Sequence, residues 1–389
     1  MILIDRKRLS LFFSVLFLSL CPFLVLSINN QLNTLLVYLG LTIAYAAFLF
    51  SVKECPSNFW LIIVLGVAYR LLPCFVATSA LSNDLTQYGY LGNKIIGGQI
   101  PYKDFSAPYP PFSLYISVPF ILAGDLRVLK IFFVSCDLAM IFLLYIILKS
   151  KFVSVDKGRF LSMLALFFPV SMLEYSVSGH NDSFTMLLLI ASVALLDSKP
   201  AFSSISLSLA VCSKIFPVLA VPFMVKYLFS KSRQASHHFL LGLVSSLSLI
   251  SAPFVLLSSS SYFEMILGTT RFSIPYGLFP TLLFALLGGA SASLAIPVLI
   301  VSSVFSAVVF LLIFTYSCVH KWELFKSLSV VFVFLPFLLP QFQPWYLLWA
   351  LPFVMLYFSE NRKMLVGYMA LLSISHFLSY AMPLLVSSV

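Results

Sequence analysis

One long polar segment, Ser79 to Phe112, interrupts an otherwise strongly apolar chain. Asp84 lies near its start in the sequence Ser-Asn-Asp, and Tyr109 lies near its end, before two prolines. The Asp84 carboxylate could act as a general base that takes a proton from an attacking hydroxyl. It could equally cap a short helix through Leu91, because Asp and Asn are good N-cap residues. A long polar loop between apolar walls is a common place for function.

A second polar motif, Gly-His-Asn-Asp, precedes an apolar run that begins near residue 183. Asp182 would serve as a helix N-cap, but capping requires neither His180 nor Asn181. The N-terminus of such a helix also favours an anion such as phosphate. The motif is therefore a candidate ligand site as well as a structural cap.

Two basic residues are candidates for a phosphate contact. Lys214 stands alone between two apolar stretches in Ser-Lys-Ile-Phe-Pro, and Arg271 lies in Thr-Arg-Phe-Ser. An ammonium binds phosphate well as a point charge. Both alternatives stay open: Lys214 could snorkel to the lipid headgroups, and Arg271 could be an ordinary loop arginine.

A late motif combines amides with aromatic rings. Gln341 and Gln343 could hydrogen-bond the hydroxyls of a sugar, and Trp345 and Tyr346 could stack on its apolar face. The same rings could instead form an aromatic belt at the membrane interface.

The elements that position these residues must be membrane helices. The chain is 61% hydrophobic and 9% charged, with a mean hydropathy of +1.05, which excludes a soluble protein. A helix needs about 20 apolar residues to cross a bilayer, and the chain offers about a dozen such runs. These runs are too long for barrel strands. The sequence predicts one all-α polytopic membrane domain over residues 1–389, with roughly 11–13 transmembrane helices.

The net charge of +10 does not indicate a nucleic-acid partner. Most of the basic residues lie in short connections between apolar runs, which is typical of cytoplasmic loops. The six cysteines are scattered without metal-ligand spacing, so we assign no metal ligand. The first apolar run follows basic residues 6–8 and is interpreted as a retained anchor in contact with membrane lipids.

The basic loops place the N-terminus in the cytoplasm and the polar loop 78–123 on the extracytoplasmic or lumenal side. The apolar stretch 112–123 within that loop is short and follows two prolines, so we expect a re-entrant or interfacial helix. Residues 201–229 are expected to break near Lys214 into a hairpin, and 278–288 is too short to cross.

This threading brings the candidate residues to one side of the membrane. Polar groups at membrane depth are expensive and usually functional, so their shared side predicts a site there. The residues that reach the outer face are Asp84, Glu174, His180, Asp182, Lys214, Arg271, Gln341 and Gln343. Arg70 and Asp137 lie inside predicted spans, where the two charges could pair.

The order of these motifs resembles GT-C-fold glycosyltransferases that use polyprenyl-phosphate sugars. The most similar are the phosphatidylinositol mannoside and GPI mannosyltransferases. The resemblance covers about residues 79 to 358, and we expect a GT-C-like helical bundle with a long first outer loop that is catalytic. The motifs that carry it are Asp84 with Tyr88, Gly97-Gly98, Pro101 to Asp104, Tyr109-Pro110-Pro111, Gly179 to Asp182, Ser213 to Pro217, Arg271 to Ser273, Pro275-Tyr276 and Gln343 to Tyr346.

The resemblance implies inverting transfer of a hexose, most often mannose, from a polyprenyl-phosphate donor. The acceptor would be a glycolipid, a lipid-linked oligosaccharide or a protein. Asp84 resembles the base, and Lys214 lies where a contact to the donor phosphate is expected. His180 and Arg271 are weaker matches for that contact. Candidates for binding the sugar or the acceptor are Asn83, Tyr88, Tyr109, Asn181, Asp182, Gln341, Gln343, Trp345 and Tyr346.

Two departures from the family pattern leave points open. Asn83 stands where many relatives carry a second acid, so a divalent cation is neither assigned nor excluded. A glutamine, Gln341 or Gln343, stands where several relatives have a histidine. A transporter or flippase for a lipid-linked saccharide is the alternative, because it would use the same outward basic cavity without a catalytic acid.

Overall fold

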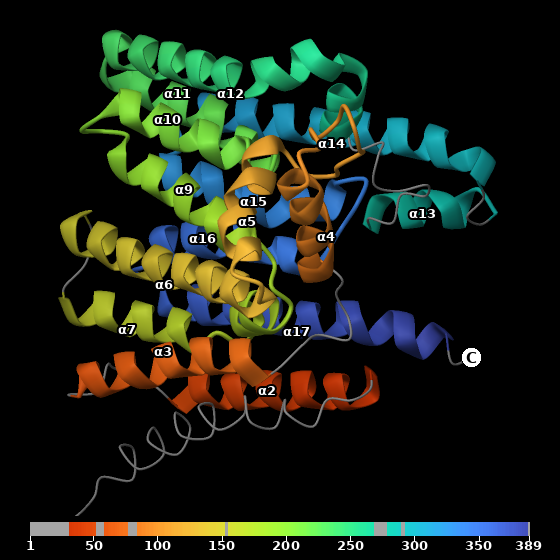
Figure 1. Ribbon diagram of the computed structural model, residues 1–389. Helices are drawn as coiled ribbons and strands as arrows, with labels where there is room; N and C mark the ends of the chain where they lie inside the picture. Colours follow the sequence, from red (N-terminus) through yellow and green to blue (C-terminus); the bar gives the residue numbers. More distant parts are fainter. Residues whose placement is uncertain are drawn as a thin grey trace, which may run out of the picture. The chain divides into compact units, whose positions relative to one another are not determined.

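The computed structural model describes residues 31–51, 58–76, 84–151, 155–267, 278–288 and 292–387. In these ranges every regular element is a helix, and no strand forms (Figure 1). This confirms the predicted all-α class. The first apolar run, together with Asn83 and Arg271, lies outside the described residues.

Three described helices are long and apolar enough to cross a membrane: α6 (Leu126–Lys151), α12 (Arg233–Leu267) and α14 (Ala292–Val319). A bent pair, Val155–Leu166 with Pro169–Val177, makes a fourth span if it is counted as one. The other apolar helices are shorter. The chain is therefore a helical membrane protein, and a total of roughly 11–13 spans stays a prediction.

The chain divides into two compact units. The first takes in the described parts of Met1–Gly89, Phe120–Leu187 and Val354–Val389, and the second those of Tyr90–Pro119 and Leu188–Phe353. One membrane domain over the whole chain stays a prediction.

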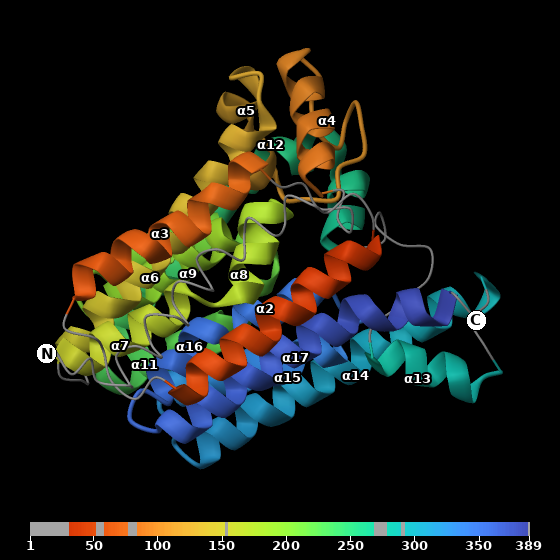
Figure 2. The same cartoon turned by 90° about the horizontal axis from the view of Figure 1, so that it is seen from below.

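In the first unit, α2 (Gln31–Ser51) packs against α17 (Arg362–Ser387), as Figure 2 shows. The helix α3 (Phe59–Val76) packs against α6, α7 (Val155–Leu166) and the π-helix η2 (Met172–Val177). Helix-on-helix packing of this kind buries the apolar faces that membrane-length segments provide. The buried aromatic rings of Tyr45, Phe48, Phe167 and Phe168 fill the core of this unit.

A break after α7 is held by a buried ion pair. The helical axis bends by 46° between α7 and the segment that begins at Pro169, because proline cannot donate a backbone hydrogen bond. Arg70 donates to the carbonyl oxygens of Leu166 (2.8 Å) and Ala165 (2.5 Å). Its Nη1 also lies 3.1 Å from Oδ2 of Asp137. The two charges that the sequence places inside apolar runs therefore pair with each other, and the pair stabilises the break.

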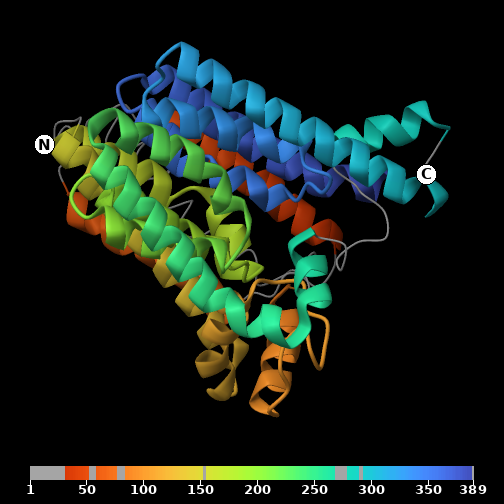
Figure 3. The same cartoon turned by 90° about the horizontal axis from the view of Figure 1, so that it is seen from above.

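In the second unit, α10 (Pro200–Val211) packs tightly against α12, and both are labelled in Figure 1. A Cβ on Gly242 would lie 2.2 Å from the Ser204 hydroxyl, so a larger residue here would force that hydroxyl to turn away. The helix α14 runs beside α15 (Leu324–Leu338), as Figure 3 shows from above. Further described helices of the chain are α8 (Pro169–Ser171), α9 (Asp182–Leu195), α11 (Val221–Lys231), α13 (Leu278–Leu286), the 3-10 helix η4 (Pro344–Trp349) and α16 (Leu351–Tyr357).

Two predicted interruptions of the apolar runs are confirmed. The chain breaks between α10 and the 3-10 helix η3 (Phe216–Ala220), and Lys214 lies in that break. The helix α13 spans nine residues, too few to cross a bilayer.

The described part of the polar segment contains two short helices, joined by a loop that a hydrogen bond from Tyr102 to Tyr109 closes. The helix α4 (Asp84–Ile96) has Asp84 in its first described turn, and α5 (Pro111–Leu122) follows the prolines. A capping role for Asp84 stays a prediction. Between them, Tyr102 adopts a φ of 69° and donates its hydroxyl to the carbonyl oxygen of Tyr109 at 2.5 Å. Its ring packs edge-on against Tyr262 of α12. An interfacial or re-entrant position for α5 stays a prediction.

Candidate active site

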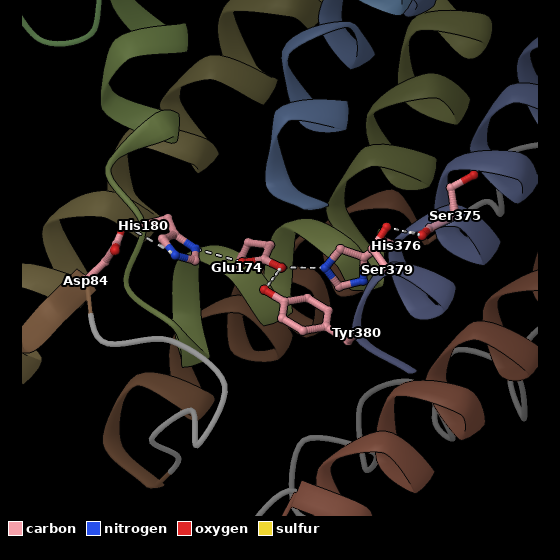
Figure 4. A network of polar contacts seen from close by, with 7 residues as sticks. All are labelled: Asp84, Glu174, His180, Ser375, His376, Ser379 and Tyr380. Carbon is pink, nitrogen blue, oxygen red and sulfur yellow. Dashed lines mark hydrogen bonds and ion pairs between the residues drawn. The ribbon is translucent and has the colours of Figure 1, made fainter. Parts of the chain in front are cut away.

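A row of polar side chains in the first unit begins at Asp84 (Figure 4). Oδ2 of Asp84 lies 3.5 Å from Nε2 of His180, and Nδ1 of His180 lies 2.7 Å from Oε2 of Glu174. His180 and Glu174 are inaccessible to solvent, whereas the Asp84 side chain is 23% exposed. Asp84 is therefore the member of the row that a ligand can reach.

The local sequence brings His180 to this position. Gly179 has a φ of +76°, a conformation that side-chain-bearing residues rarely adopt. A Cβ at Gly179 would also approach Cδ1 of Leu85 in α4 to 3.0 Å. The amide of His180 then bonds back to the carbonyl oxygen of Glu174 at 3.0 Å, at the end of η2. A single π-helical turn in a helical segment often accompanies a functional site.

Two residues of α17 complete the row from its far end. Nε2 of His376 contacts Oε1 of Glu174, and the Tyr380 hydroxyl donates to the same oxygen at 3.0 Å. The sequence reasoning missed both residues and gave Glu174 no role. The available signal was a histidine and a tyrosine four residues apart in an otherwise apolar C-terminal run, because such polar groups usually face a bundle interior.

Charge around His180 favours its protonated form. Burial by itself lowers the pKa of His180, but the carboxylates of Asp84, Glu174 and Asp182 outweigh that effect and raise the pKa above 6.5. An imidazole between two carboxylates can hold a proton at either nitrogen.

This arrangement could hold Asp84 in a fixed orientation as a general base. One reactive group, Asp84, meets an imidazole, and a buried carboxylate fixes the far nitrogen of that imidazole. Chemically, such a row can take a proton from a hydroxyl bound at Asp84 and can hold the carboxylate in one orientation.

A cavity of about 280 Å³ in the second unit gathers other predicted residues. Lys214, Gln341 and Tyr346 line it together with apolar side chains from the end of α12, such as Ile266 and Leu267. Lys214 is 7% exposed. An ammonium among apolar walls suits a phosphate carried on a lipid chain.

Aromatic rings stack at this cavity. Trp349 lies between Phe216, at a centroid distance of 3.8 Å, and Tyr346, at 4.0 Å. Both faces of Trp349 are therefore covered, and Tyr346 is the outer ring of the stack. An outer aromatic ring beside an amide is a common surface for a sugar.

The other predicted binding residues lie in several environments. Tyr88 is buried with its ring against Phe133, and Tyr109 is buried beside Tyr102. Asn181 and Asp182 are buried next to His180. In the late motif, Gln343 and Trp345 are half-buried, as are Gln341 and Tyr346. Their binding roles stay predictions.

No three His, Cys, Asp or Glu side chains of the described chain converge in a way that could hold a metal ion.

Comparison with known proteins identifies the family. The model of glycosyltransferase family 87 matches residues 107–339, which is more than half of the chain. No curated protein matches the chain significantly. The matched residues include Glu174, His180 and Lys214, whereas Asp84 and His376 lie on either side of them. The chain belongs to glycosyltransferase family 87, and it is a membrane glycosyltransferase.

Proposed function

We propose that the chain transfers a hexose, with mannose as the expected sugar, from a polyprenyl-phosphate donor to a hydroxyl of a lipid-linked, glycan or protein acceptor. The transfer inverts the anomeric carbon, and Asp84 is the general base. The observation that carries this proposal is the row from Asp84 through His180 to Glu174, in a member of a glycosyltransferase family.

The reaction is a single displacement. The Asp84 carboxylate takes the acceptor hydroxyl proton while the acceptor oxygen attacks the anomeric carbon from the face opposite the phosphate. The bond from that carbon to the phosphate oxygen breaks, and the lipid phosphate leaves with the electron pair. Attack opposite the leaving group inverts the configuration, so one base is sufficient.

Lys214 is assigned to the donor phosphate. Its ammonium lines a cavity whose walls are otherwise largely apolar, which suits a phosphate attached to a prenyl chain. The positive charge would stabilise the departing phosphate as negative charge develops on it. Gln341 and the outer ring of Tyr346 are assigned to the sugar, and Arg271 is kept as a second candidate for the phosphate.

We assign His180 a contact with Asp84 and not with the donor phosphate. Its two ring nitrogens face Asp84 and Glu174, so a phosphate contact would have to displace a carboxylate. An anion also gains little from a ring whose charge two acids already balance.

The orientation proposed for the enzyme follows the distribution of Lys and Arg. The N-terminus is cytoplasmic, and the reaction takes place on the extracytoplasmic or lumenal side.

Transfer by the purified protein in liposomes tests the proposal. Radiolabelled polyprenyl-phosphate mannose and polyprenyl-phosphate glucose are supplied in parallel, with extracted native lipids as acceptors. We expect labelled product chiefly from the mannose donor. Digestion with α- and β-specific glycosidases should show an anomer opposite to that of the donor.

Two outcomes would contradict the proposal. Transfer from a nucleotide sugar but from neither lipid donor would exclude the assigned donor class, and a product with retained configuration would exclude the single displacement. Passage of labelled donor across the bilayer without product would favour the flippase.

A further inference from the structure

We propose that His376 is a positioning residue for the transfer reaction, which acts on Asp84 through Glu174 and His180. This inference rests on the proposed function of Asp84 as the base. His376 lies in the C-terminal helix α17, beyond the residues that match the family.

Three side chains contact the carboxylate of Glu174. His180 faces Oε2, whereas His376 and Tyr380 both face Oε1. Glu174 is fully buried, so water cannot replace a donor that is lost. The orientation of this carboxylate determines where Nδ1 of His180 is held, and therefore where Nε2 meets Asp84.

The His376 ring is itself held in place. The Tyr38 ring stacks on it at a centroid distance of 5.7 Å and an interplanar angle of 20°. The Tyr380 ring meets it at 5.2 Å and 71°. His376 and Tyr38 are each 1% exposed, so the imidazole has little freedom to turn away from Glu174.

The difference in burial between Asp84 and His376 indicates that His376 orients its neighbours and does not carry a proton to solvent. A proton taken up by Asp84 can leave directly to solvent, because that side chain is 23% exposed. His376 is 1% exposed, and the described groups that face it are Glu174, Tyr38 and Tyr380. The geometry therefore gives His376 an orienting role.

Two substitutions separate this role from simple packing. His376→Phe keeps a flat ring against Tyr38 but removes the nitrogen that meets Glu174, whereas His376→Gln keeps a donor and removes the ring. If His376 positions Glu174, we expect kcat to fall about tenfold or more in His376→Phe and to stay nearer the wild-type value in His376→Gln. KM for donor and acceptor should change little in either variant, because His376 is assigned no contact with substrate.

Ser379→Ala is the matched control on the same helix. The Ser379 hydroxyl donates only along α17, to the carbonyl oxygen of Ser375 at 2.7 Å, so its removal should leave kcat unchanged. Thermal unfolding of each variant in detergent checks that the compared proteins are folded.

The closing experiment combines His376→Phe with Asp84→Asn. If His376 acts through Asp84, adding His376→Phe to Asp84→Asn should not lower the residual kcat of Asp84→Asn further. Wild-type kcat in folded His376→Phe, or a larger loss in His376→Gln than in His376→Phe, would overturn the inference while leaving Asp84 as the base. Full activity in Asp84→Asn would overturn the proposed function itself.

Discussion

Nδ1 of His180 lies 2.7 Å from Oε2 of Glu174, and both side chains are inaccessible to solvent. A buried carboxylate beside an imidazole selects which nitrogen carries the proton. Nε2 of the same ring faces Asp84, so the charge and orientation of Glu174 affect the protonation of the His180 ring beside Asp84.

Glu174→Gln should lower kcat on the order of 100-fold or more, because the amide lacks the negative charge that favours the protonated His180 ring facing Asp84. The side chain keeps its shape, so KM for the donor should change little. Glu360→Gln is the matched control, since Glu360 is 58% exposed in its ion pair with Lys157. Equal kcat values for the two variants would contradict the orienting role of Glu174.

Stability should depend on pH through His180. The carboxylates raise the pKa of this ring above 6.5 in the folded protein. Stability contributed by the protonated ring is therefore fully present below pH 6.5 and declines as the pH rises through the raised pKa. The difference in unfolding temperature between wild type and His180→Gln should thus be largest in acid and shrink in base. His237→Gln makes the same substitution at an exposed histidine and serves as the control.

Lys214→Ala should weaken the use of the donor. A charge-assisted hydrogen bond to phosphate contributes about 1.5–3 kcal/mol, so kcat/KM for the donor should fall about 10-fold to 100-fold. KM for the acceptor should stay near the wild-type value. Lys103→Ala removes an exposed lysine of the same unit and serves as the control. A selective loss of acceptor affinity in Lys214→Ala would contradict the donor assignment.

The pair Arg70–Asp137 should govern stability rather than chemistry. Arg70→Met leaves Asp137 buried without its cation, which costs about 3–5 kcal/mol. Adding Asp137→Leu should recover part of that loss, because the double variant buries no lone charge. Unfolding in detergent measures both effects, and a double variant less stable than Arg70→Met would contradict this account. For comparison, Glu360→Gln removes an exposed ion pair with Lys157 and should lower the free energy of unfolding by no more than about 1 kcal/mol.

Much of the fold could be predicted from hydropathy alone. The all-helical class, the break at Lys214 and the short helix over 278–286 follow from the lengths of apolar runs and from proline positions. The π-helical turn at Glu174 could not be predicted, because the hydrogen-bond shift that creates it depends on packing around the turn.

The sequence indicates Asp84 and His180 as candidate site residues but gives no role to Glu174 and His376. Asp84, His180 and Lys214 stand out because each is polar beside an apolar run. Glu174 and His376 meet only through folding, since 202 residues separate them along the chain. Spacing in one sequence carries no information on such a contact, so the sequence alone favours a phosphate contact for His180.

The most direct test of the central claim is the initial rate of hexose transfer by Asp84→Asn. Asp125→Asn makes the same chemical change at a surface aspartate whose side chain is 40% exposed, and it serves as the control in the same assay. With both proteins equally folded, we expect near wild-type transfer by Asp125→Asn and a loss of about 100-fold or more in Asp84→Asn. Equal transfer by the two variants would show that Asp84 is not the base.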